Sequence, residues 1–207
     1  MLDMQNDQTP HIYKGIPSEV SKLPLIKKLQ SYTLYIPSNV YQKILATCNY
    51  APTKEWSGVL FYKTKGSFEK NTLNIECVDF LIMDLGESAF TDFVESPEII
   101  SYMVDNDLLD CYTGLIHSHN NMNAFFSGTD ISTLLQEGTT TSHFVSLIVC
   151  NKGPYVAAIT RKINDQSKTI SNCSYTSFKN KINTYKKIEE SESNYIEYFP
   201  LIVECES

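Results

Sequence analysis

The residues of this chain whose types and spacing could support catalysis are His117 and His119, with Ser127 and Asp130 shortly after them. Two histidines two positions apart on a strand project from the same face, so both imidazoles can reach one ion. A helix beginning near Ser127 would bring the Asp130 carboxylate back as a third ligand. These three ligands leave one position of a tetrahedral zinc ion open to water, whose pKa such an ion lowers to about 7. The spacing therefore predicts a hydrolytic zinc site with one ion and one catalytic water per chain.

A glutamate far upstream could supply the acid and base that hydrolysis also needs. A carboxylate that is not itself a ligand can orient the water and carry its proton to the leaving amine. Glu55, in the run Glu-Trp-Ser-Gly-Val-Leu, is the candidate. Three plainer interpretations stay open. Glu55 could sit on a solvated strand end, the histidines could form a metal-free cross-strand pair, and Ser127 could be an ordinary helix N-cap that also orients its hydroxyl.

The whole pattern is Glu-x-x-Gly-x-Leu, then His-Ser-His, seven residues, Ser, two residues and Asp. It resembles the motif of the JAMM (MPN+, Mov34/MPN/PAD-1) zinc metallopeptidases over roughly residues 30 to 160. The resemblance implies zinc on His117, His119 and Asp130, Glu55 as general acid and base, and Ser127 as hydrogen-bond donor to the oxyanion. It also implies a protein substrate with an extended C-terminal tail, such as ubiquitin or a ubiquitin-like protein on lysine, and an activating protein partner.

One position departs from the family's pattern. Many eukaryotic members carry proline after the second histidine, whereas this chain has Asn120. Because proline fixes φ and stiffens a loop, its absence predicts a differently shaped or looser lip beside the substrate. The form His-Ser-His-Asn is more similar to JAMM proteins of bacteria and their phages than to proteasomal ones.

The elements that must position these residues favour an α/β (α+β) fold. Hydrophobic alternation and turn residues predict strands over 32–36, 55–62, 73–84, 111–119, 144–150 and 155–160. Helices are predicted after Pro37, from Pro97, and from Ser127 to just before Gly138. The resemblance implies the MPN, cytidine-deaminase-like αβα sandwich, with a curved mixed β-sheet flanked by helices.

Three segments are expected along the chain. They are an N-terminal extension over 1–28, the catalytic domain over 29–162, and a C-terminal extension over 163–207 that packs on or continues the domain. In the last segment we expect a strand over 167–177, a charged helix over 179–192 and an edge strand over 195–204. The polar or glycine-containing segments 84–97 and 137–142 are candidate lids.

Composition narrows the partners and the compartment. The net charge of −7 argues against nucleic acid as a partner. Six cysteines without Cys-x-x-Cys pairs fit reduced thiols, and no stretch is long and apolar enough to span a membrane. Without a signal-peptide pattern at the N-terminus, a cytoplasmic location is expected. A Cys/His protease using His143 as base is a competing chemistry, for which the sequence offers no local signature.

The expected function is that of a zinc-dependent metallopeptidase that hydrolyses an isopeptide or peptide bond, in the manner of a deubiquitinase. Two alternatives remain. A processing endopeptidase of a phage or bacterial structural protein would use the same residues, and a noncatalytic MPN scaffold would use the fold for assembly.

Overall fold

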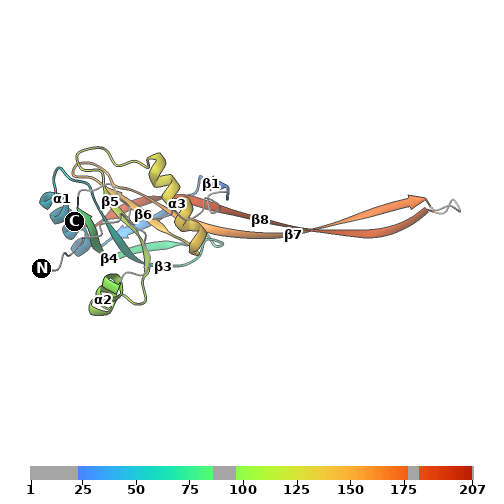
Figure 1. The fold of residues 1–207 in the computed structure, drawn as a ribbon, viewed down its shortest axis with the longest axis horizontal. Coiled ribbons are helices and arrows are strands. Elements are labelled where there is room, and N and C mark those ends of the chain that lie inside the picture. Colours follow the sequence, from blue (N-terminus) through green and yellow to red (C-terminus); the bar gives the residue numbers. More distant parts are fainter. Residues whose placement is uncertain (1–22, 86–96, 177–181, 207) are drawn as a thin grey trace, which may run out of the picture.

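A closed sheet with a projecting two-stranded arm forms the frame of the protein (Figure 1). The computed structural model describes residues 23–85, 97–176 and 182–206. The strands are β1 (Leu25–Lys27), β2 (Tyr32–Ile36), β3 (Trp56–Lys65), β4 (Asn74–Leu85), β5 (Tyr112–Ser118), β6 (Val145–Val149), β7 (Val156–Thr176) and β8 (Ile182–Cys205). The helices are α1 (Ser38–Tyr50), α2 (Pro97–Asp105) and α3 (Gly128–Thr140). Within the described part of the chain, none of these helices is long and apolar enough to cross a membrane.

The sheet closes because β7 pairs with β8. Its order is β1-β8-β2-β4-β3-β5-β6-β7, and the β7–β8 pairing joins seven of the strands into a barrel, with β1 as an extra parallel partner of β8. Among the described residues, 163–176 and 182–195 pair with each other alone and form the arm in Figure 1. The expected αβα sandwich is therefore wrong. Strands make up 44% of the structure, and a sheet closed on itself cannot lie between two helix layers.

The C-terminal part of the chain explains why the fold prediction failed. The prediction of a charged helix over 179–192 is wrong, because β8 begins at Ile182. Ile182 pairs with Thr176, and the rest of this stretch pairs with β7 in antiparallel order. Lysine and glutamate favour helix locally, but long-range pairing overrides that preference. The strand expected over 195–204 is the end of β8, which pairs with β7 on one side and with β1 and β2 on the other, so it is not an edge strand. The sheet thus draws strands from all three expected segments.

Helix α3 also extends further than the sequence predicts. It continues through Gly138 to Thr140. A Cβ at Gly138 would lie 3.0 Å from Thr160 Oγ1, so this glycine permits close packing on the barrel and does not end the helix. The candidate lid over 137–142 therefore begins inside a helix. Of the other candidate lid, residues 86–96 lie outside the described residues.

Apolar side chains fill the barrel interior and also cover part of its outside. Leu60 and Ile116 belong to the interior cluster. On the outside, α2 packs against Phe61, and Leu134 of α3 packs against Leu115. Consequently β3 and β5 are covered on both faces, which gives the candidate site a rigid base.

Candidate metal centre

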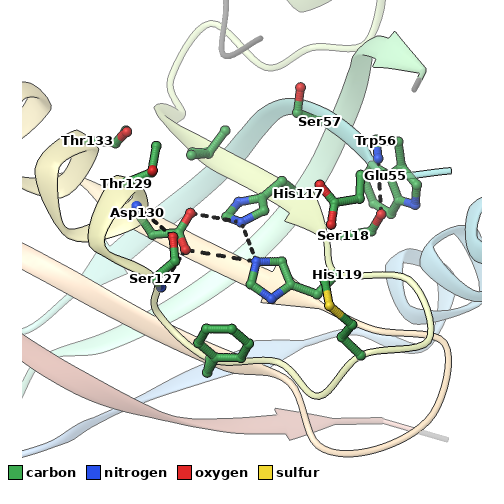
Figure 2. Close-up of a pocket in the computed structure, with 13 residues that line it drawn as sticks. Glu55, Trp56, Ser57, His117, Ser118, His119, Ser127, Thr129, Asp130 and Thr133 are labelled. Atoms are coloured by element: carbon green, nitrogen blue, oxygen red, sulfur yellow. Dashed lines mark hydrogen bonds and ion pairs between the residues drawn. The ribbon is translucent and has the colours of Figure 1, made fainter. Parts of the chain in front are cut away.

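The outer face of β5, next to α3, carries the two histidines. Side chains alternate along a strand, and Leu115 on this strand faces α3 while Ile116 faces the barrel interior. His117 follows on the Leu115 side, and His119 comes directly after the strand. The His119 N–H donates to the Val149 carbonyl at 2.9 Å, which extends the β5–β6 pairing by one residue. Both imidazoles therefore point to the same side, as Figure 2 shows.

The side chains of His117, His119 and Asp130 converge on one point. The two Nε2 atoms are 3.3 Å apart. His117 Nε2 lies 3.1 Å from Asp130 Oδ1, and His119 Nε2 lies 3.9 Å from Asp130 Oδ2. One potential ligand atom from each residue lies within 4.8 Å of the others. These three residues could hold a metal ion.

The start of α3 fixes the Asp130 carboxylate. The Ser127 N–H donates to Asp130 Oδ2 at 2.7 Å, and the Asp130 N–H donates to Ser127 Oγ at 3.3 Å. This reciprocal pair is a capping box, which satisfies two otherwise unpaired N–H groups at the helix start. Ser127 is thus the N-cap of α3. The Ser127 side chain also hydrogen-bonds the Asp130 carboxylate, and because a carboxylate can only accept, the hydroxyl is the donor in that contact.

The environment of Asp130 favours the ionised carboxylate. Burial raises the pKa of this group, but hydrogen bonds from His117 and Ser127 outweigh burial and lower the pKa to about 2. The carboxylate is therefore charged at neutral pH, as a metal ligand must be.

The two imidazole nitrogens suit a small tetrahedral ion. Bonds of about 2.0–2.2 Å around such an ion hold its ligand atoms roughly 3.3–3.6 Å apart, and the two Nε2 atoms are 3.3 Å apart. Asp130 approaches His117 with one carboxylate oxygen, at 3.1 Å, and His119 with the other, at 3.9 Å. The Nδ1 atoms of both histidines are buried and make no hydrogen bond with the described residues. The Phe125 ring lies edge-on to the His119 ring, with 5.1 Å between centroids, so packing helps to hold this imidazole.

A pocket of about 440 Å³ opens over the three residues. Glu55 and Ser127 line it together with His117, His119 and Asp130, so the structure gathers all five predicted site residues in one place. The remaining lining residues are Trp56, Ser57, Leu115, Ser118, Met122, Phe125, Thr129 and Thr133. Met122 and Phe125, which are about half-exposed, form an apolar lip on one side.

Glu55 reaches the pocket from the start of β3. Ser57 pairs with His117 across the β3–β5 ladder, and Glu55 is two positions before Ser57. In Figure 2 the Glu55 carboxylate points toward the histidine pair. A β-bulge between Ser57 and Gly58 follows directly, and a Cβ at Gly58 would lie 2.1 Å from the Leu81 carbonyl oxygen. Glycine is therefore required at this bulge, where the β4 backbone approaches too closely for a side chain.

The loop after His119 has a backbone shape that proline could not adopt, and hydrogen bonds connect it to its neighbours. Asn120 has a φ of 49°, whereas proline is held near −65°. The Asn120 carbonyl accepts from the Asn151 N–H at 2.7 Å, and the His119 carbonyl accepts from the Met122 N–H at 2.9 Å. The prediction of a different shape fits this geometry, while that of a looser lip stays a prediction.

Sequence reasoning missed the residues that tie this loop to Glu55. Ser118, Asn121 and Asn151 all hydrogen-bond to the chain immediately around Glu55. Asn151 belongs to Asn-Lys-Gly-Pro, which the sequence shows only as a turn between two strands. No pattern along the chain could have indicated a contact across 99 positions.

No protein-family model matches this chain, and no curated protein matches it.

Proposed function

We propose that this protein is a zinc-dependent hydrolase of the JAMM type that cleaves an isopeptide or peptide bond. The observation that carries the proposal is the convergence of His117, His119 and Asp130 in a pocket that Glu55 and Ser127 also line. Two imidazoles and one carboxylate form a ligand set that leaves a position open, which is typical of catalytic zinc and not of structural zinc. When bound, the ion would act as a Lewis acid and supply a nucleophilic water at neutral pH.

The protein's own groups would handle the protons and the developing charge. Glu55 would accept a proton at its carboxylate during attack and return it to the leaving amine, which is general acid–base catalysis by one residue. The Ser127 hydroxyl, which hydrogen-bonds the Asp130 carboxylate, would turn to donate to the oxyanion. No covalent bond between enzyme and substrate is needed.

The closed sheet limits how a substrate could bind. β3 is paired with β4 and β5, and β5 with β3 and β6, so an extended tail cannot add a strand beside the described part of the pocket. A tail would instead cross the pocket between α3 and the lip of Met122 and Phe125. The acyl group of a lysine conjugate with a flexible C-terminal tail, as on ubiquitin-like proteins, can reach such a position.

Zinc stoichiometry tests the metal site directly. We expect about one zinc per chain by elemental analysis, lost in His117→Ala, His119→Ala and Asp130→Ala. His143→Asn is the matched control, because His143 binds Tyr62 and does not line the pocket. If protein reloaded with zinc retains none, the hydrolase proposal fails and the noncatalytic scaffold takes its place.

Cleavage tests the reaction class. The probes are a branched peptide, whose lysine ε-amine carries the C-terminal tail of ubiquitin, and a linear peptide with the same tail. Preferred cleavage of the branched probe supports an isopeptidase, and preferred cleavage of the linear probe supports a processing endopeptidase. Glu55→Gln should retain zinc and lose turnover. A Glu55→Gln protein as active as wild type would remove Glu55 from the mechanism.

A further inference from the structure

Two hydrogen-bonded links hold the chain on either side of Glu55. The first lies after it: the Trp56 N–H donates to Ser118 Oγ at 3.0 Å. Ser118 is fully buried and Trp56 nearly so, at 0% and 2% exposed. Because Ser118 stands between His117 and His119, its hydroxyl points away from the imidazoles and toward the barrel interior. The bond thus joins the residue after Glu55 to the residue between the two histidines.

The second link lies before Glu55. Asn151 Nδ2 donates to the Pro52 carbonyl at 2.9 Å and to Asn121 Oδ1 at 3.2 Å. Asn121 Nδ2 lies 3.4 Å from the same Pro52 carbonyl. The Asn151 N–H also binds the Asn120 carbonyl at 2.7 Å, so one asparagine connects the turn before Glu55 to the loop after His119.

The carboxylate itself has no comparable support. Among the described residues, no hydrogen bond or ion pair is formed by the Glu55 side chain. Its position therefore depends on the backbone, which the two links fix on each side. A general acid or base works only within hydrogen-bond reach of the proton it moves, and a small displacement is costly to the rate.

We propose that Ser118 and Asn151 are positioning residues that hold Glu55 beside the metal centre, a role that rests on the proposed function. Neither residue contributes a donor atom to the three-residue ligand group. The ligands are held separately, by the β3–β5–β6 pairing and by the capping box of α3. Loss of either link should therefore displace Glu55 and leave metal binding intact.

Hydrogen exchange in the metal-free protein tests the links without any substrate. In Ser118→Ala the Trp56 amide should exchange about tenfold faster, the factor that corresponds to one ordinary net hydrogen bond. In Asn151→Asp, which removes the donated bond to Pro52, exchange should rise at the Lys54 amide, which donates to the Ala51 carbonyl at 3.3 Å within the same turn. Ser146→Ala is the control for the first variant, because Ser146 is a buried serine on β6 whose hydroxyl has no partner among the described residues. Asn74→Asp, which removes a similar bond to the Thr72 carbonyl, controls for the second.

Turnover of the cleaved probe then tests the positioning role. In Ser118→Ala and Asn151→Asp, kcat should fall at least about tenfold while KM and zinc affinity stay within about twofold of wild type. Ser118→Thr, which keeps the oxygen, should recover exchange protection at Trp56 and kcat together. Combining Ser118→Ala with Glu55→Gln should cost no more than Glu55→Gln alone, because both act through one group.

Each failure has its own signature. Unchanged exchange in both variants overturns the links themselves. Faster exchange with unchanged kcat, or a loss of zinc affinity in either variant, overturns the positioning of Glu55. A wild-type protein that cleaves neither probe fails the proposed function, and the positioning role falls with it, whereas the exchange result still decides whether the links exist.

Discussion

Asp130 and His117 are joined across the site by a contact of 3.1 Å between Asp130 Oδ1 and His117 Nε2, while the other Asp130 oxygen caps α3. One carboxylate therefore serves two purposes, closing the ligand group and fastening the helix start. The variant Asp130→Asn should separate the ligand role of this residue from its capping role. The amide oxygen can still accept from the Ser127 N–H, so the free energy of unfolding of the metal-free protein should fall by no more than about 2 kcal/mol, which is what a carboxylate with its pKa lowered to about 2 contributes at neutral pH. Metal affinity, measured by competition with a chelator, should fall more than about 100-fold, because the charged ligand is lost. Wild-type affinity would contradict a ligand role.

Substitution can separate the role of Ser127 as the N-cap of α3 from its proposed role as donor to the oxyanion. Alanine removes the cap and should cost about 1 kcal/mol in urea unfolding of the metal-free protein, whereas glycine should cost only a few tenths. Both remove the hydroxyl, so turnover should fall about 10²–10³-fold in both if Ser127 stabilises the oxyanion. A glycine variant with wild-type turnover would leave Ser127 as a cap alone.

The sequence predicts the local parts of the site well, for a physical reason. His117 and His119 share a face because strands alternate, and Ser127 caps α3 through a bond to a residue three positions later. Both relationships are short-range and leave a pattern along the chain. Glu55 comes close to the two histidines through the register between β3 and β5. Local patterns along the chain do not indicate that register, so Glu55 is predicted at the site from the motif resemblance.

The global topology could not be predicted in the same way. Barrel closure depends on pairings such as Ala157 with Leu201, which local propensity does not encode. The charge-rich stretch over 179–192 favours helix by composition, yet β8 begins within it. Likewise Gly138 is typical of a helix stop, but here its missing side chain allows α3 to pack against Thr160.

Asn120 tests whether the loop after His119 needs its left-handed backbone. Asn120→Pro should destabilise the protein by more than about 1 kcal/mol, because proline cannot adopt a φ of 49°. Asn120→Gly should be close to neutral, since glycine adopts positive φ readily. Urea unfolding of the two variants measures the difference. A proline variant as stable as wild type would show that the loop can take another conformation.

The pH dependence of stability should reveal His143, which lies outside the metal centre. Tyr62 OH lies 2.9 Å from His143 Nδ1, the Tyr112 ring packs edge-on against the imidazole, and burial lowers the pKa of His143. The unfolded chain therefore takes up a proton here at higher pH than the folded one, so stability rises with pH. This contribution is complete above the unfolded pKa of about 6.5 and is lost as the pH falls toward the lower folded value.

His143→Asn keeps an acceptor for Tyr62 and does not titrate. Urea unfolding of metal-free wild type should thus lose more stability between pH 7.5 and pH 5 than the variant does. Parallel curves for the two proteins would show that His143 accepts a proton in the folded state as easily as in the unfolded chain.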